Sequence, residues 1–178
     1  MKDRFNKSKR VALYGVLIAT AIVFGYVEHL IPLPIGIYGI KLGLSNIVTV
    51  VAMYLIGNIP ALCINVLRAL LCSLLFGNAF SLAYSLCGGI VAAIAMIAIK
   101  RLPSIGITGV SITGGVAHNI AQLCVAVILF EELKIAFYLP VLLAAGAITG
   151  FLIGVVAIPV TNNKYIKEIF KSINKKGA

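Results

Sequence analysis

Long apolar stretches, separated by short polar or charged breaks, dominate the sequence between Val11 and Val160. A helix needs roughly 20 apolar residues to cross the hydrocarbon core of a bilayer. A water-soluble core cannot hold this much apolar surface, so the pattern predicts an all-α, polytopic membrane protein built as one six-helix bundle. The expected spans are approximately residues 11–31, 42–57, 61–76, 79–99, 109–130 and 136–160.

The second and third spans are short, and the sequence Gly-Asn-Ile-Pro at 57–60 separates them. They form either a tight helical hairpin or one broken span. Glycine followed by asparagine and proline is a signal for one helix to stop and another to begin. A single helix would also carry Pro60 at mid-bilayer, and the hairpin is therefore the favoured interpretation.

The charges are distributed unevenly around these spans. With six spans both basic tails, 1–10 and 161–178, lie on one side together with Lys100 and Arg101, which places twelve of the fifteen Lys and Arg residues there. This bias predicts cytoplasmic termini. The mean hydropathy is +1.10 and the net charge is +10. Anionic membrane lipid is the natural counter-charge for the tails, and we expect no nucleic-acid partner.

The third span carries Arg68 among leucines and isoleucines. Asn65, Arg68 and Cys72 follow i, i+3, i+7 spacing and share one helix face. An arginine at this depth costs at least about 2.5–3.5 kcal/mol and should face protein, water or an anion. Two interpretations stay open: Arg68 binds a ligand, or it pairs with Glu28.

The fifth span carries a short polar ladder of His118, Asn119 and Gln122. His118 and Gln122 are four residues apart and lie on one face, and Asn119 is three residues from Gln122. Hydrogen bonding between helices explains a single such residue. The three together favour a pocket for a polar ligand.

A third cluster is expected at the outer ends of the first two spans. Glu28 lies near the end of the first, an apolar loop rich in Pro and Gly follows at 31–40, and Lys41 and Asn46 open the second. We expect the loop to cover the bundle as a lid, with Lys41, Asn46 and the helix N-terminus near an anion. Ordinary helix capping with an interfacial lysine is the alternative.

Tyr84 precedes Gly88 and Gly89 in the fourth span. Paired glycines indicate close helix packing, with substrate contact as the alternative. Small residues also recur four positions apart in the first and sixth spans, which permits close packing within the bundle or against a partner. These stripes consist of Gly15 and Ala19, Ala21 and Gly25, and Gly146, Gly150 and Gly154.

Four segments carry a resemblance to a known family. They are the stretches 41–47 (KLGLSNI), 67–77 (LRALLCSLLFG), 85–89 (SLCGG) and 115–122 (GVAHNIAQ). They resemble, in the same order, the Gx transporter family, also labelled heptaprenyl diphosphate synthase component I. That family is similar to the S components of energy-coupling factor vitamin transporters.

The resemblance implies a multi-pass protein of the bacterial plasma membrane, with a ligand pocket near the outer face capped by the first loop. A membrane coupling subunit and two ATPases would drive release, and the small residues Gly15, Ala19, Ala21 and Gly25 would be the docking face. The expected substrate-binding residues are Glu28, Lys41, Asn46, Arg68, Tyr84, His118, Asn119 and Gln122.

A catalytic prenyl synthase would require a different set of residues. Its reaction needs Mg²⁺ ions held by clustered carboxylates, whereas the chain has one aspartate, Asp3, and one acidic pair, Glu131 and Glu132. No phosphate-binding loop of the Gly-rich, Lys-Ser/Thr type is present either. We expect a protein that is not an enzyme and holds no metal or cofactor. The alternative function is a non-catalytic subunit of a polyprenyl diphosphate synthase or a membrane redox complex.

Overall fold

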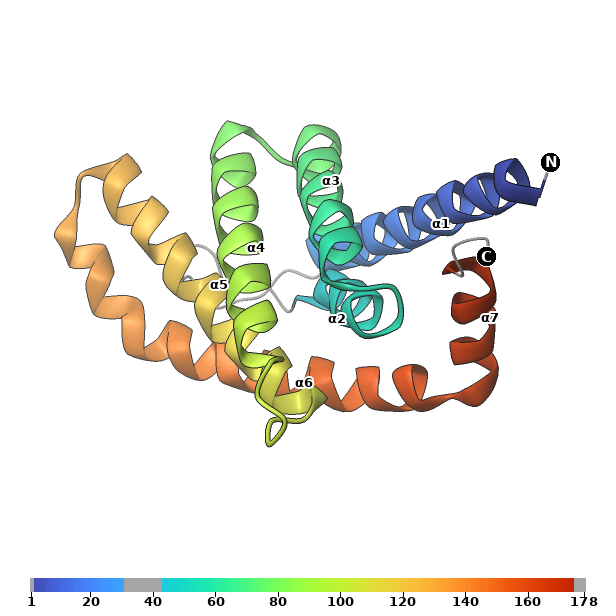
Figure 1. The fold of residues 1–178 in the computed structure, drawn as a ribbon. Coiled ribbons are helices and arrows are strands. Elements are labelled where there is room, and N and C mark those ends of the chain that lie inside the picture. Colours follow the sequence, from blue (N-terminus) through green and yellow to red (C-terminus); the bar gives the residue numbers. More distant parts are fainter. Residues whose placement is uncertain (1, 31–42, 175–178) are drawn as a thin grey trace.

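The computed structural model describes residues 2–30 and 43–174, and every regular element in this part of the chain is a helix. The expected all-α membrane fold is confirmed. Figure 1 shows how the longer helices are arranged around the short helix α2. The bounds are α1 (Lys2–Leu30), α2 (Leu44–Leu55), α3 (Asn58–Phe76), α4 (Ala79–Ile99), α5 (Ile107–Phe130), η1 (Leu133–Tyr138, a 3-10 helix), α6 (Leu139–Asn162) and α7 (Lys164–Asn174).

Within these described residues, five stretches are long and apolar enough to cross a membrane, and α2 is apolar but shorter. Its twelve residues extend about 18 Å, well below the thickness of the hydrocarbon core. Gly57 stands between α2 and α3 with φ 128°, a conformation that side chains rarely adopt. Pro60 lies in the first turn of α3, where a missing N–H is tolerated. The chain therefore has two helices here instead of one broken span.

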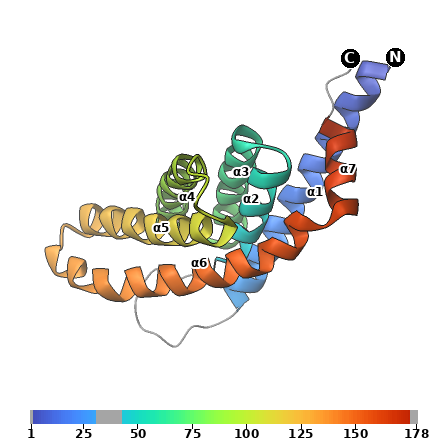
Figure 2. The same ribbon diagram turned by 60° about the horizontal axis from the view of Figure 1, so that its bottom comes forward.

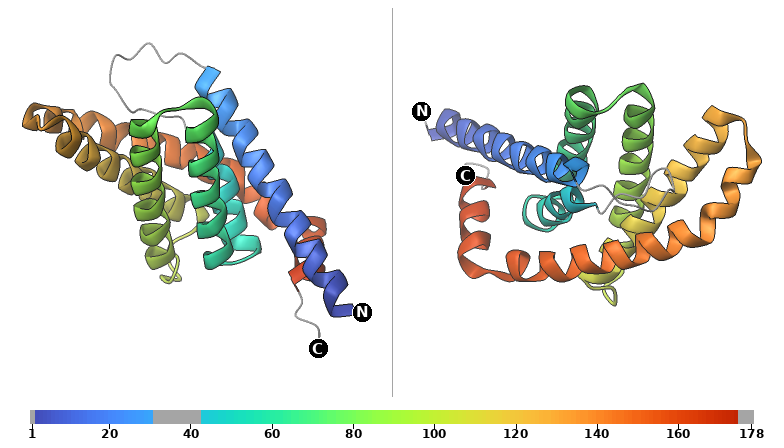
Figure 3. Two further views of the ribbon diagram at one scale, coloured as in Figure 1. Left: turned by 90° about the horizontal axis from the view of Figure 1, so that it is seen from above. Right: turned by 180° about the vertical axis from the view of Figure 1, so that it is seen from behind.

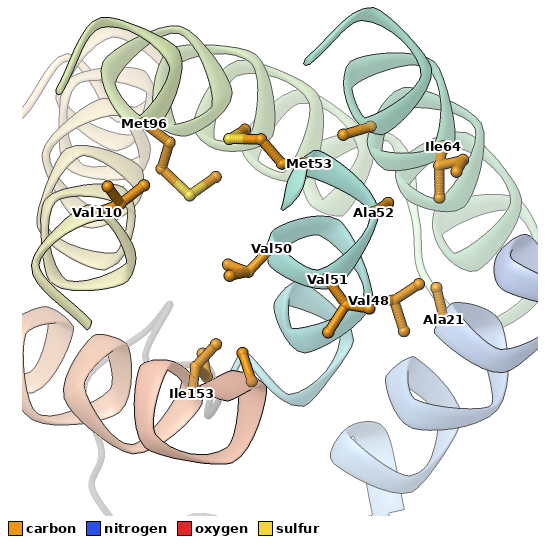
Figure 4. Close-up of a cluster of buried hydrophobic side chains, with 12 residues drawn as sticks. Ala21, Val48, Val50, Val51, Ala52, Met53, Ile64, Met96, Val110 and Ile153 are labelled. Carbon is orange, nitrogen blue, oxygen red and sulfur yellow. The ribbon is translucent and has the colours of Figure 1, made fainter. Parts of the chain in front are cut away.

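Helix α2 forms the centre of the hydrophobic core. Seven of its twelve residues are buried. In Figure 4, Val48 points toward Ala21 of α1, whereas Val50 points into the space between Met96 of α4 and Ile153 of α6. Backbone at membrane depth is tolerated where protein surrounds it. This enclosure explains how a helix too short to span the bilayer is accommodated within the bundle.

Helices α5 and α6 are packed backbone to backbone, and Figure 2 shows them running side by side. A Cβ atom added at Gly150 would lie 2.7 Å from the Cα atom of Ile112, and one at Gly154 would lie 2.6 Å from that of Thr108. Gly146 approaches the backbone of α5 in the same way. The glycine stripe of the sixth span therefore packs inside the molecule.

The connections between helices gather at two opposite ends of the molecule. Figure 3 (left) shows the end of α1, the α3–α4 connection and the turn between α5 and α6 at one end. The α2–α3 turn, the α4–α5 turn, the start of α1 and the end of α7 lie toward the other. The start of α1 and the end of α7 therefore lie toward the same end of the molecule.

The segment after the sixth span, expected only as a basic tail, forms helix α7. Asn163 separates it from α6, and its Oδ1 accepts hydrogen bonds from the backbone N–H groups of Tyr165 (2.9 Å) and Ile166 (3.2 Å). This is a standard N-terminal cap. Arg10 of α1 donates from Nε to the carbonyl oxygen of Ile173 at 3.2 Å and so ties the far end of α7 to α1.

Candidate functional site

Arg68 lies in the middle of α3, and its guanidinium group is buried against α2. Nη1 donates to Ser45 Oγ at 2.6 Å, and Nη2 donates to Asn65 Oδ1 at 2.9 Å. The residue is 8% exposed, and its Nε has no hydrogen-bond partner among the described residues. A charged donor at this depth is costly until its N–H groups are satisfied. At least one N–H of Arg68, that of Nε, therefore has no acceptor among the described residues.

Asn65 extends this polar contact to a third helix. Its Nδ2 donates to the carbonyl oxygen of Gly89 in α4 at 2.8 Å. A Cβ atom at Gly89 would lie 2.9 Å from the same Nδ2, so only glycine allows this approach. The glycine pair of the fourth span thus serves close packing, and a continuous polar chain joins α2, α3 and α4 around Arg68.

Two cavities meet at Arg68. The first, of about 40 Å³, lies among α2, α4, α5 and α6, and the second, of about 220 Å³, lies between α1, α3 and the start of α4. Glu28, Arg68 and Ser85 line both. The other polar residues of the first cavity are Ser45, Asn46, Ser111, His118, Asn119 and Thr149. Those of the second are His29, Ser73 and Ser81, beside the ring of Phe76.

Glu28 joins the end of α1 to the start of α2. Its Oε1 accepts a hydrogen bond from the backbone N–H of Gly43, the residue that precedes α2. Gly43 has φ 72°, a left-handed conformation that favours glycine. An acidic and a basic side chain therefore face the same two cavities, which suits a ligand with polar or charged groups.

The three polar residues of α5, His118, Asn119 and Gln122, differ in their surroundings. His118 and Asn119 line the first cavity, although Asn119 also donates from Nδ2 to the carbonyl oxygen of Leu142 in α6 at 2.8 Å. The His118 ring packs at Gly88, where a Cβ atom would lie 2.8 Å from its Cε1. Gln122 is 5% exposed, and neither atom of its amide has a hydrogen-bond partner in the described part of the chain.

The structure thus brings together five of the predicted substrate-binding residues and separates others from them. Tyr84 and Gln122 line neither cavity. Lys41 and the apolar loop at 31–40 lie outside the described residues. The five that share the first cavity are Glu28, Asn46, Arg68, His118 and Asn119.

Several hydroxyl groups of the site were not selected from the sequence. Ser85, Ser111 and Thr149 line the first cavity. An isolated hydroxyl in an apolar helix is ambiguous, because it often bonds to the carbonyl one turn back. Thr113 Oγ1 does this with Gly109 at 3.0 Å, and Thr149 Oγ1 does it with Gly146 at 3.4 Å. Only the tertiary structure shows which of these hydroxyl residues line a cavity.

The small residues proposed as a docking face on α1 point in different directions. Ala21 is fully buried in the core, and a Cβ atom at Gly25 would meet Cys72 Sγ at 2.9 Å. Gly15 and Ala19 are exposed, and nothing lies within 4 Å of a Cβ atom at Gly15. A docking role stays a prediction that only Gly15 and Ala19 are positioned to fulfil.

A family model described as heptaprenyl diphosphate synthase component I matches residues 17–159. The chain belongs to this family. No curated protein and no solved structure matches it. The region that the family model matches begins in α1 and ends in α6. It includes all of the residues that line the two cavities. In the described part of the chain, no group of three or more His, Cys, Asp or Glu residues is placed to hold a metal ion.

Proposed function

We propose that this protein is a membrane subunit that binds a small polar or anionic solute at Arg68. One observation carries the proposal: a buried guanidinium, whose Nε has no hydrogen-bond partner in the described part of the chain, lies where two cavities meet. Intramembrane ionisable residues mark ligand or ion pathways by default. An acceptor oxygen of a ligand would satisfy the Nε–H of Arg68.

The cavities limit the class of solute. The larger one, about 220 Å³, lies below the range of roughly 300–1,000 Å³ that drug-sized ligands occupy. Arginine recognises carboxylate and phosphate oxygens, while Phe76 offers an apolar ring for the body of the molecule. A vitamin-like cofactor precursor or a small isoprenoid-related anion combines these features.

Uptake of this solute is the proposed role, with energy supplied by a coupling membrane subunit and ATPases in a bacterial plasma membrane. The protein is proposed to be non-catalytic. Support comes from its composition, because a chain with one aspartate and no phosphate-binding loop offers neither the Mg²⁺ ligands of a prenyl synthase nor the ATP site of a pump.

The family description favours a second candidate, a non-catalytic membrane subunit of a polyprenyl diphosphate synthase. In that case the protein would bind the catalytic subunit and bring it to the membrane, where a long prenyl product partitions. The two candidates differ in the partner that they require.

Native mass spectrometry of the protein, gently extracted from its own host, separates these candidates. A bound metabolite together with a coupling subunit or an ATPase is the result expected for the transporter subunit. A stoichiometric prenyl synthase or redox partner with no bound metabolite would overturn that role and support the second candidate.

Variants test the site itself. Arg68→Ala and His118→Ala, at two residues that line the first cavity, are each expected to reduce the amount of co-purified metabolite, and Arg68→Lys should retain part of it by keeping the charge. Tyr84→Phe, outside both cavities, is the matched control and should retain all of it. Unchanged retention in both alanine variants would contradict the proposed pocket.

A further inference from the structure

Helix α7 carries a wide apolar face that the rest of the molecule covers only in part. The face consists of Tyr165, Ile166, Ile169, Phe170 and Ile173, at spacings that place them on one side of a helix. Ile166, Phe170 and Ile173 are partly buried. Tyr165 and Ile169 are 79% and 55% exposed. One flank of the apolar face therefore has no covering element in the described structure.

Both ends of α7 are attached at the edge of the membrane-spanning region. Its first residue follows Asn163, directly after the span that ends at Asn162. Its last turn is held by the bond from Arg10 to Ile173, and Arg10 lies in the first turn of the span that begins at Ser8. In Figure 1 α7 turns sharply away from α6, so its direction differs from that of the span that precedes it.

The opposite side of α7 is basic. Lys164, Lys167 and Lys171 are exposed and share that side with a single acidic residue, Glu168. An amphipathic helix with lysines on its polar face and apolar residues on the other is typical of helices that lie in the headgroup region. The cores of protein interfaces, in contrast, are depleted in Lys and Glu. This charge pattern favours an anionic lipid surface over a protein partner.

We propose that α7 is an interfacial anchor that inserts Tyr165 and Ile169 at the boundary between headgroups and acyl chains and prefers anionic lipid. The lysines reach the headgroup phosphates while their stems cover the edge of the apolar face. The anchor fixes the C-terminal end of α6 and the start of α1 at one membrane surface. This role is independent of the solute proposed for Arg68.

The chain contains no tryptophan, so a single introduced indole reports one position. We would reconstitute the full-length variants Tyr165→Trp and Lys167→Trp in nanodiscs that contain lipids brominated on their acyl chains. The indole at 165 is expected to lose about half or more of its fluorescence and to emit at shorter wavelength, because it lies in the acyl boundary. The indole at 167, on the basic side, is the matched control and should be quenched far less.

A second comparison tests the preference for anionic lipid. Quenching at position 165 should be stronger in discs of phosphatidylglycerol and phosphatidylcholine than in phosphatidylcholine alone. Changing Lys164, Lys167 and Lys171 to Gln should remove that difference. Equal, weak quenching at 165 and 167 in folded protein would overturn the anchor and assign the surface to a protein partner. Strong quenching without dependence on lipid charge would overturn the anionic preference.

Discussion

Ser45 and Thr49 lie one turn apart on α2, and each is 1% exposed, yet their hydroxyl groups differ in role. Ser45 Oγ accepts the short hydrogen bond from Arg68, whereas Thr49 Oγ1 has no partner among the described residues. Ser45→Ala should lower the free energy of unfolding by about 1–3 kcal/mol, because it leaves a buried charged donor unsatisfied.

Thr49→Val is the matched control for that substitution. It removes an unsatisfied hydroxyl at nearly constant volume and should leave stability unchanged or raise it by up to about 1 kcal/mol. Reversible unfolding by SDS in mixed micelles measures both changes. Equal losses in the two variants would contradict the role assigned to Ser45.

Lys100, which directly follows α4, contacts the C-terminal end of α2. Its Nζ donates to the carbonyl oxygen of Met53 at 2.6 Å and to Asn58 Oδ1 at 3.1 Å, and lies 4.7 Å from the centre of the Tyr54 ring. It thereby satisfies a carbonyl group at the end of the helix. Partial burial lowers the pKa of Lys100 below its ordinary value.

The lowered pKa of Lys100 determines whether the stability of the protein rises or falls with pH. The folded state loses the Lys100 proton at a lower pH than the unfolded chain, so its stability contribution rises between the lowered pKa and the ordinary lysine pKa. Relative to Lys100→Arg, which stays charged, the protein should therefore gain stability as the pH is raised from neutral into this window. Thermal unfolding of both proteins in one detergent measures it, and a constant difference would count against the burial of Lys100.

At the scale of the elements, the contact between α5 and α6 depends on glycine. Gly150→Ala should lower the free energy of unfolding by about 1–3 kcal/mol, because the new methyl group meets the backbone of Ile112 and Ser111, which cannot move without separating the helices. Gly15→Ala, where nothing lies within 4 Å, should be neutral or stabilising by up to about 1 kcal/mol. Thermal unfolding in detergent compares the two, and similar effects would refute the tight contact.

The whole molecule leads to a prediction about orientation. In a cysteine-free background, Glu132→Cys in the turn after α5 should react with a membrane-impermeant maleimide in intact cells. Ser104→Cys in the exposed turn between α4 and α5 should react only after the membrane is permeabilised, because the distribution of Lys and Arg predicts that this turn lies inside with the basic ends of the chain. Labelling of both positions from the same side would rule out this topology.

Much of the fold can be predicted from the order of apolar, charged and turn-forming residues along the chain. Helices α4 and α5 lie within two residues of the expected spans, because charged or turn-forming residues end each apolar run. Helix α7 was not expected, because eleven residues rich in lysine are marginal as a helix until they pack on another element. Its amphipathic spacing was the signal that was available.

The candidate site could be predicted only where a charged or strongly polar residue occurs in an otherwise apolar span. Arg68, His118 and Asn119 stand out because the bilayer penalises them, and the structure places all three on one cavity. Tyr84 and Gln122 carried a similar signal but face elsewhere. Ser85 and Thr149 carried none, since a hydroxyl is compatible with an apolar helix through a bond to its own backbone.

By itself the sequence determined that this protein is helical, that it crosses a membrane and that a charge lies buried in its third span, since each follows from local hydrophobicity and the cost of burying polar groups. Tertiary structure decided that the short helix α2 is the core, that Arg68 is shared by two cavities, and that the stripe on α1 is divided between core and surface. Those outcomes depend on which helix faces meet, and spacing along one helix leaves its rotation and its neighbours unspecified.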